Sequence, residues 1–149
     1  MLRVTTRGRY ALRAMLDLAL NRCEGPVPRH EIAERQDLSS HYVAHLFRQL
    51  REAGLVASVK GPSGGYVLAR DPGSIRISEI VRAVEGPIAL ADCVLPIQDD
   101  LCQRLDRCAA HRLWMRLSET MVAFLDAISL ADLCKEAREL EPEAGGCRD

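Results

Sequence analysis

The chain has 149 residues, of which 48% are hydrophobic and 28% are charged, and its formal net charge is −1. This length and composition are typical of one soluble domain with an appended helix, and they supply enough apolar side chains for a core without a disulfide framework. No apolar run approaches the length of a membrane span, so we expect no membrane association and a cytoplasmic location. Thiols stay reduced in the cytosol, where clustered cysteines indicate metal binding or redox chemistry.

The charges are distributed unevenly along the chain. Residues 1–76 contain 12 Lys and Arg against 7 Asp and Glu, a net charge of +5, whereas residues 77–149 contain 8 against 14, a net charge of −6. The basic half is suited to contacts with DNA phosphates, which would repel the acidic half. A merely solvated basic surface would have the same composition, so charge alone leaves both interpretations open.

Three helices are predicted in the first 54 residues. Thr5 or Thr6 can cap the first, Pro28 opens a short second helix, and Ser39 is the predicted N-cap of a third helix that ends at Gly54. Apolar residues at helical spacing should turn inward from the third helix, namely Val43, Leu46, Phe47 and Leu50. A short helix, a tight turn and a second helix with a polar outer face predict a helix-turn-helix. Its outer face, the predicted contact with double-stranded DNA, carries Ser40, His41, Ala44, His45 and Arg48.

A β-hairpin is predicted next. Two short strands flank a turn rich in glycine, between Lys60 and Tyr66. Glycines at the tip would let the hairpin approach a DNA backbone closely, and the predicted contacts are Lys60, Gly61, Ser63 and Gly64. A glycine-rich turn can also cradle nucleotide phosphates, but the G-x-x-x-x-G-K-[ST] pattern is missing and no helix begins at the turn. We therefore predict a winged helix-turn-helix domain over residues 1–86.

The second half is predicted to contain three more helices. Ser78 is expected to cap one that ends at Gly86, and a long amphipathic helix should run from about Cys108 to Ile128. A capping-box pattern that begins at Ser129 predicts a final short helix. The expected segments are thus a loop over 87–107, the long helix with the C-terminal helix over 108–140, and a disordered tail over 141–149. The predicted fold is mainly α, a winged helix-turn-helix with a small β-hairpin wing plus a long dimerisation helix.

The long helix carries an apolar stripe. Its residues Leu117, Met121, Phe124 and Ile128 present more apolar surface than the N-terminal half is expected to cover. DNA-binding proteins of this size usually dimerise, so that two recognition helices reach half-sites one turn apart. We expect an isologous homodimer through this stripe, although the stripe could instead pack on its own domain.

Three cysteines and a histidine lie close together in the sequence. Cys93, Cys102, Cys108 and His111 follow the spacing C-x8-C-x5-C-x2-H. Such ligands can saturate a tetrahedral zinc ion or a [2Fe–2S] cluster. Structural zinc sites usually use tight C-x2-4-C pairs, so the wide spacing favours the larger cluster. Unrelated buried thiols and a surface histidine are the alternative, but these cysteines lie in a polar segment and not on apolar stripes.

Four segments resemble a known family: TTRGRYALRAMLDLAL, GPVPRHEIAERQ, LFRQLREAGLVASVKGPSGGYVL and HRLWMRLSETMVAFLDAISLADL. They are similar to the IscR-like members of the Rrf-two-type bacterial winged-helix transcription regulators, over about residues 2–135. The resemblance implies a dimeric DNA-binding regulator of iron–sulfur cluster assembly genes, its own operon included. It also implies a [2Fe–2S] cluster on the four ligands named above, and cluster scaffold proteins as partners.

The chain departs from that family at two places. The spacing between Cys93 and Cys102 is three residues longer than expected. Glu and Gln are expected where Ala44 and His45 stand, and these side chains read cytosine and adenine, whereas Ala offers only apolar contact. The DNA sequence that family members bind can therefore not be assigned to this chain from the resemblance.

Other functions are weaker alternatives. A nitric-oxide-sensing repressor of the same family would use an N-terminal carboxylate on its cluster, but residues 1–16 contain no Asp or Glu. A redox-sensing repressor of that family, or a zinc- or thiol-responsive repressor without iron, would keep the same DNA-binding half. An enzyme is not expected, because no H-x-E or HExxH pattern is present.

For the leading hypothesis, we expect that cluster binding orders the loop over 87–107 against the long helix. This ordering would set the spacing of the two DNA-binding domains in the dimer.

Overall fold

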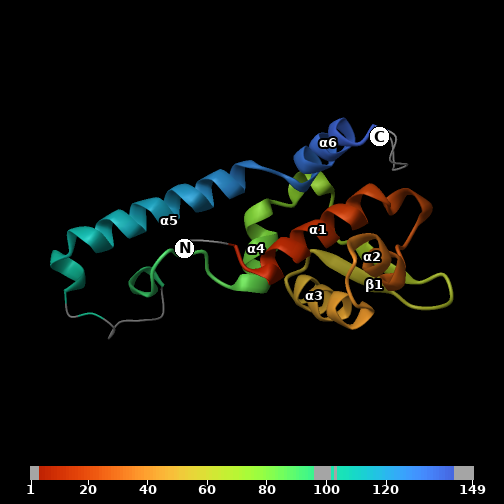
Figure 1. The fold of residues 1–149 in the computed structure, drawn as a ribbon, viewed down its shortest axis with the longest axis horizontal. Coiled ribbons are helices and arrows are strands. Elements are labelled where there is room, and N and C mark those ends of the chain that lie inside the picture. The colour runs from red at the N-terminus through yellow and green to blue at the C-terminus, as the bar shows by residue number, and fades with distance from the viewer. Residues whose placement is uncertain (1–3, 96–101, 103, 143–149) are drawn as a thin grey trace.

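The computed structural model describes residues 4–95, 102 and 104–142. Helices α1 (Thr6–Leu20), α2 (Arg29–Gln36) and α3 (Ser40–Glu52) are followed by the strands β1 (Val56–Val59) and β2 (Gly65–Leu68), and then by α4 (Ile77–Glu85), α5 (Ala109–Ala127) and α6 (Leu130–Leu140). Figure 1 shows α1 to α4, the hairpin and α6 gathered in one body, from which α5 projects as an arm. The predicted fold, mainly helical with a two-stranded hairpin, is confirmed.

The helix ends follow the capping residues of the sequence in most places. Thr5 accepts a hydrogen bond from the backbone N–H of Gly8, and Ser39 accepts one from that of Tyr42 (N···O 3.1 Å). Ser129 and Asp132 form the expected capping box, and the hydrogen bonds from Ser129 hold the pKa of the Asp132 carboxyl below its usual value.

The predicted cap at Ser78 is wrong. Helix α4 begins one residue earlier, at Ile77, so Ser78 lies in its first turn and is fully buried. Its hydroxyl donates to the carboxylate of Asp126, near the end of α5. A serine before an apolar run has the pattern of a cap, but here the hydroxyl joins two helices through residues that are 48 positions apart in the sequence.

The core lies between α1 and the helices around it. The largest fully buried side chains are Phe47, Met15, Leu18, Ile32, Leu46, Leu50, Leu55, Ile75, Ile80 and Leu130. The inward stripe predicted for α3 is confirmed, because Val43, Leu46, Phe47 and Leu50 are all buried. Helix α6 belongs to this body: it packs against α1, and its Cys134 is buried in the core. The chain thus leaves the body after α4 and returns to it after α5.

The arm is exposed over most of its length. Of the 19 residues of α5, only Ser118 is buried. At its end the arm is joined to the body by Ile77, whose N–H donates to the carbonyl of Ile128 (N···O 3.0 Å), and by the Ser78–Asp126 hydrogen bond. The described helices include none that is long and apolar enough to cross a bilayer. The predicted disordered tail lies outside the described residues from position 143 onward.

A buried carboxylate joins the first two helices. Asp17 of α1 is 5% exposed, and Arg35 of α2 donates to both of its carboxylate oxygens, with N···O distances of 2.9 to 3.2 Å. Gln36 donates to the same carboxylate at 2.9 Å. The bond to Asp17 raises the pKa of the Arg35 guanidinium above its ordinary value, against the opposing effect of burial. These contacts set the end of α2, and therefore the turn into α3, against α1.

We predict that Arg35→Ala lowers the free energy of unfolding by about 2 kcal/mol, because the buried carboxylate of Asp17 loses its charge-assisted hydrogen bonds. Arg29→Ala removes an exposed arginine at the other end of α2 and should change stability by less than about 0.5 kcal/mol. Urea unfolding followed by circular dichroism measures both variants. Equal stabilities for the two would contradict a structural role for the Asp17–Arg35 pair.

Candidate functional site

Helix α3 lies at the surface of the body with its polar side outward. The buried stripe of α3 faces the core, and the opposite side carries exposed His41 and Arg48 and the half-exposed Ser40, Ala44 and His45. The turn before it, from Gln36 to Ser39, passes through Asp37 in the left-handed region (φ 53°). The five helix residues that the sequence predicted for DNA contact therefore all lie on the accessible side of α3.

The hairpin is fastened beside α3 by an aromatic pair. The ring of Phe47 in α3 stacks on Tyr66 of β2, with a centroid distance of 4.3 Å and an interplanar angle of 29°. Tyr66 also pairs through its backbone with Val27, both N···O distances being 2.9 Å. This close approach requires glycine at position 65, since a Cβ there would lie 2.2 Å from the carbonyl oxygen of Val27. The hairpin is thus held in one position relative to α3.

The loop between the strands projects from the body. Lys60, Gly61 and Ser63 are exposed and Gly64 is half-exposed, and Figure 1 shows this loop at the end of the body opposite to the arm. Gly64 donates its N–H to the carbonyl of Gly61 (N···O 3.0 Å), and a Cβ at Gly64 would lie 2.2 Å from the carbonyl oxygen of Val59. The tight turn therefore has a thin tip with a lysine at its base, as predicted for a wing that approaches a DNA backbone.

A basic and aromatic cluster beside α3 was not predicted. Tyr10 of α1 contacts Tyr42 in the first turn of α3 edge-to-face, with centroids 6.2 Å apart. The guanidinium groups of Arg9 and Arg13 lie 6.0 and 5.3 Å from the centroid of the Tyr10 ring. The repeated arginines of the segment TTRGRYALR were a signal, but only the packing of α1 on α3 places them next to the recognition helix. They extend the positive surface around α3.

The predicted metal ligands lie on or beside the arm. Cys108 is the N-cap of α5, where its sulfur accepts a hydrogen bond from the backbone N–H of His111 (N···S 3.4 Å). The Nδ1 atom of His111 is buried and has no hydrogen-bond partner among the described residues. An imidazole nitrogen without a hydrogen-bond partner can serve as a metal ligand when it carries a lone pair. Cys108 and His111 therefore lie together at the start of α5, and Figure 1 shows that α5 begins at the end of the arm away from the body.

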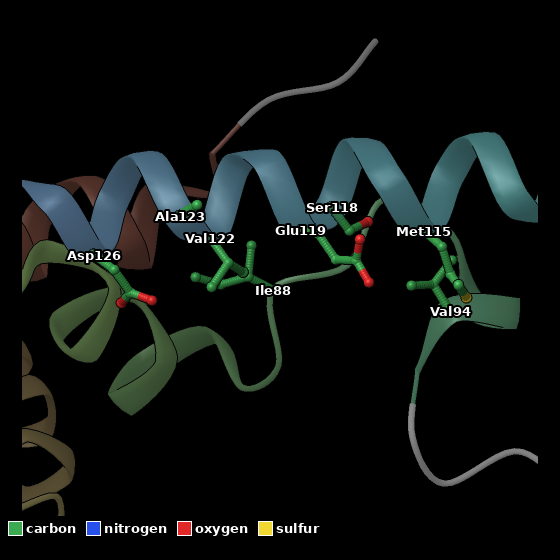
Figure 2. A pocket seen from close by; sticks show the side chains of 8 residues that line it. All are labelled: Ile88, Val94, Met115, Ser118, Glu119, Val122, Ala123 and Asp126. Carbon is green, nitrogen blue, oxygen red and sulfur yellow. The ribbon is translucent and has the colours of Figure 1, made fainter.

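The other two cysteines are not gathered around that pair. Cys93 lies in a 3-10 turn (Asp92–Val94), whose Val94 faces Met115 of α5 in Figure 2. Met115 is seven residues beyond Cys108, which is about 10 Å along a helix axis. Cys93, Cys102 and Cys108 are all half-buried, and no three potential ligands among the described residues are close enough together to hold one metal ion. Three thiols and an imidazole suit an iron–sulfur cluster chemically, and among these four residues the structure shows a hydrogen bond between Cys108 and His111.

The arm has two different long sides. Figure 2 shows Met115, Ser118 and Val122 on the side that faces residues 86–95, where Ile88 lies opposite Val122. This side lines a pocket of about 420 Å³, and Ser118 accepts a hydrogen bond from the N–H of Leu90 (N···O 3.1 Å). Another side exposes large apolar residues, namely Leu113 (52%), Trp114 (37%), Leu117 (40%) and Phe124 (65%). Met121 is half-buried, and Ile128 packs against the core of the body.

A helix-turn-helix with an outward polar recognition helix and a glycine-tipped hairpin beside it defines a winged-helix DNA-binding protein. Residues 4–136 match the Rrf2 family, described as iron-dependent transcriptional regulators. The chain belongs to this family and is a DNA-binding transcription regulator. Its relatives are regulators and not enzymes, which supports the expectation of no enzymatic activity.

The chain is similar to several named transcription regulators over most of its length. It is 46% identical to the HTH-type transcriptional regulator IscR of Xenorhabdus nematophila and 44% identical to that of Klebsiella pneumoniae, over 94% of this chain and 84% of each relative. Among solved structures, T. potens IscR is 38% identical with a TM-score of 0.77, over 97% of this chain and 94% of that one. CymR, the global cysteine regulator of B. subtilis, is also 38% identical, with a TM-score of 0.73 over 91% and 98%.

Proposed function

We propose that this chain is a cytoplasmic, homodimeric transcription regulator that senses iron–sulfur cluster status through a [2Fe–2S] cluster and controls cluster assembly genes. The observation that carries the proposal is the pairing of Cys108 and His111, with its unpartnered imidazole nitrogen, at the end of an arm attached to a winged helix. The names of the IscR relatives support the same function. The proposal has three parts, which concern DNA, the second protomer and the cluster.

The first part is the DNA interface. Helix α3 enters the major groove, where Ser40, His41, Ala44, His45 and Arg48 approach bases or phosphates, and the wing residues Lys60, Gly61, Ser63 and Gly64 approach the backbone. The position of these residues on the outer side of α3 and in the projecting wing loop supports this placement, as does the Phe47–Tyr66 stack that fixes the wing relative to α3. Arg48 and Lys60 are the exposed cations of the predicted set, and they would neutralise phosphates.

We predict that Lys60→Ala weakens binding to a 30-bp mixed-sequence duplex and reduces the slope of log K against log salt by about one per protomer, because one phosphate contact is lost. Arg48→Ala should behave in the same way. Lys135→Ala, on α6, removes an exposed lysine of the opposite half of the chain and should leave the slope unchanged. Fluorescence anisotropy titrations at several salt concentrations measure the slopes, and a wild-type slope for Lys60→Ala would remove the wing from the interface.

The second part is the homodimer. Leu113, Leu117, Met121 and Phe124 follow one another at helical spacing along one side of α5, and three of them are among the most exposed large apolar residues of the structure. An exposed apolar stripe on a projecting helix is typical of a surface that another chain covers. A second copy of the chain would bury this stripe against its own identical stripe in a symmetric interface, and it would supply the second recognition helix. Since Ile128 packs on the body, we place the centre of the interface at Leu117, Met121 and Phe124.

We predict that Phe124→Glu converts the dimer into a folded monomer. Phe124 is 65% exposed in one chain, so a charge there costs little within the protomer but would be buried without a partner in the dimer. Leu140→Glu is the matched control, because Leu140 is 82% exposed on α6 and lies outside the stripe. Light scattering after size exclusion gives the masses. A dimeric Phe124→Glu variant would contradict the proposed interface.

The third part is the cluster. We propose Cys93, Cys102, Cys108 and His111 as its ligands, with the protein thiolates and one imidazole completing the coordination of two irons. When bound, the cluster supplies a group whose loading and oxidation state respond to iron, oxygen and nitric oxide. The backbone N–H of His111 already points at the Cys108 sulfur, and a hydrogen bond to a ligand sulfur is one of the interactions that tune such a cluster. The unpartnered Nδ1 of His111 supports its role as the fourth ligand.

We predict about two irons and two acid-labile sulfides per chain in protein purified without oxygen, with a red-brown colour. Cys108→Ala should lose both and still form a dimer that binds DNA non-specifically. Cys134→Ala is the control, because this cysteine is buried in the core with α6 and should not affect iron content. If wild-type protein binds DNA but contains zinc or no metal, the cluster hypothesis is contradicted, and a zinc- or thiol-responsive repressor becomes the favoured function.

A further inference from the structure

The outer side of α3 carries hydrogen-bond donors and lacks acidic acceptors. The first three turns of the helix, residues 40–51, contain no Asp or Glu, and Glu52 follows only in the last turn. Opposite the buried stripe lie His41, His45 and Arg48. Cytosine presents a donor in the major groove, and adenine presents a donor beside its N7 acceptor, whereas guanine presents two acceptors. Thymine presents a single acceptor, O4, beside its methyl group, so a helix face of donors without a carboxylate is best matched to the two acceptors of guanine.

The three donor side chains are not engaged elsewhere. Other basic residues near α3 have partners: Arg35 binds Asp17, and Arg51 donates to Ser58 (N···O 3.3 Å). In residues 4–95, 102 and 104–142, neither imidazole of α3 takes part in a hydrogen bond or an ion pair, and the same holds for Arg48. No bond within the chain has to be broken before these groups contact DNA.

The two histidines differ in their surroundings. His41 in the first turn is exposed, whereas His45, one turn further along, is half-buried against the body. A side chain that its neighbours already restrict loses less rotamer freedom when it binds, so His45 is better suited to select one base edge. The exposed imidazole of His41 is better suited to a phosphate, which accepts a hydrogen bond from any sequence.

We propose that His45 reads a guanine in each half-site, donating an imidazole N–H to the O6 atom. This inference rests on the proposed placement of α3 in the major groove. The proposed contact uses the imidazole tautomer whose groove-facing ring nitrogen carries the proton, which is the nitrogen that donates to O6. Adenine places its N6 amino group where guanine has O6, so two donors would face each other and the A·T pair would be rejected.

The experiment begins with a duplex selected from a random pool by the full-length wild-type protein. Each guanine of the selected half-site is then replaced in turn, as a G·C to A·T exchange in both half-sites. Wild-type protein should lose affinity roughly tenfold per half-site at one of these guanines, the effect of one hydrogen bond lost and one donor left unpaired. His45→Ala should bind the original and exchanged duplexes equally. His45→Gln should prefer the exchanged duplex, because Gln pairs with adenine.

His41→Ala is the matched control on the same helix. It should weaken both duplexes alike and keep the preference for guanine. Selected half-sites without guanine, or a His45→Ala variant that still discriminates as wild type does, would overturn the reading by His45. A selected duplex whose affinity is unchanged by Arg48→Ala, His41→Ala and His45→Ala would instead contradict the placement of α3 in the groove. The failure of this inference and that of the proposed DNA interface are thereby distinguished.

Discussion

The position of the recognition helix depends on the buried carboxylate of Asp17. Its hydrogen bonds to Arg35 and Gln36 tie the end of α2 to α1, and the chain then turns through Asp37 directly into α3. Burial of a charge without partners would be unfavourable, so the carboxylate, the guanidinium and the amide have to come together in one arrangement. The apolar stripe of α3 can then pack on the core with its histidines outward. The position of the wing depends in turn on that of α3, since Tyr66 stacks on Phe47 of that helix.

A second set of contacts connects the arm to this frame. Asp126, near the end of α5, accepts a hydrogen bond from Ser78 and lies 3.9 Å from a guanidinium nitrogen of Arg82. Backbone bonds made by Ile128 and Leu130 pair the chain with Ile77 and Ile75, at the start of α4 and just before it. Helix α4 in turn packs on α1, where its Glu85 accepts a hydrogen bond from the N–H of Gly8 at 2.8 Å. These packed contacts connect the arm with the recognition helix α3, and they are the route that the proposed sensor would use.

The body and the arm differ in how closely their residues are packed. The DNA-binding body is tightly packed, and glycines such as Gly65 are required because backbones meet there. The arm is nearly uncovered, and its far end carries Cys108 and His111. An exposed apolar helix is stabilised by a partner and not by its own domain, so the proposed dimer and the proposed cluster both belong to the part of the chain with the least cover of its own.

The amino-acid sequence by itself determined the local structure: the helix-turn-helix, the caps at Thr5, Ser39 and Ser129, the hairpin and the long helix, because periodicity and capping act within a few residues. The pairing of Cys108 with His111, three residues apart at the start of α5, is local as well. That Cys93 and Cys102, both among the described residues, do not complete a metal site with this pair was decided only by the tertiary structure. The role of Ser78, the Arg9–Tyr10–Arg13 cluster beside α3 and the return of α6 to the core were likewise set by packing. These depend on contacts between residues far apart in the chain, which no local pattern encodes.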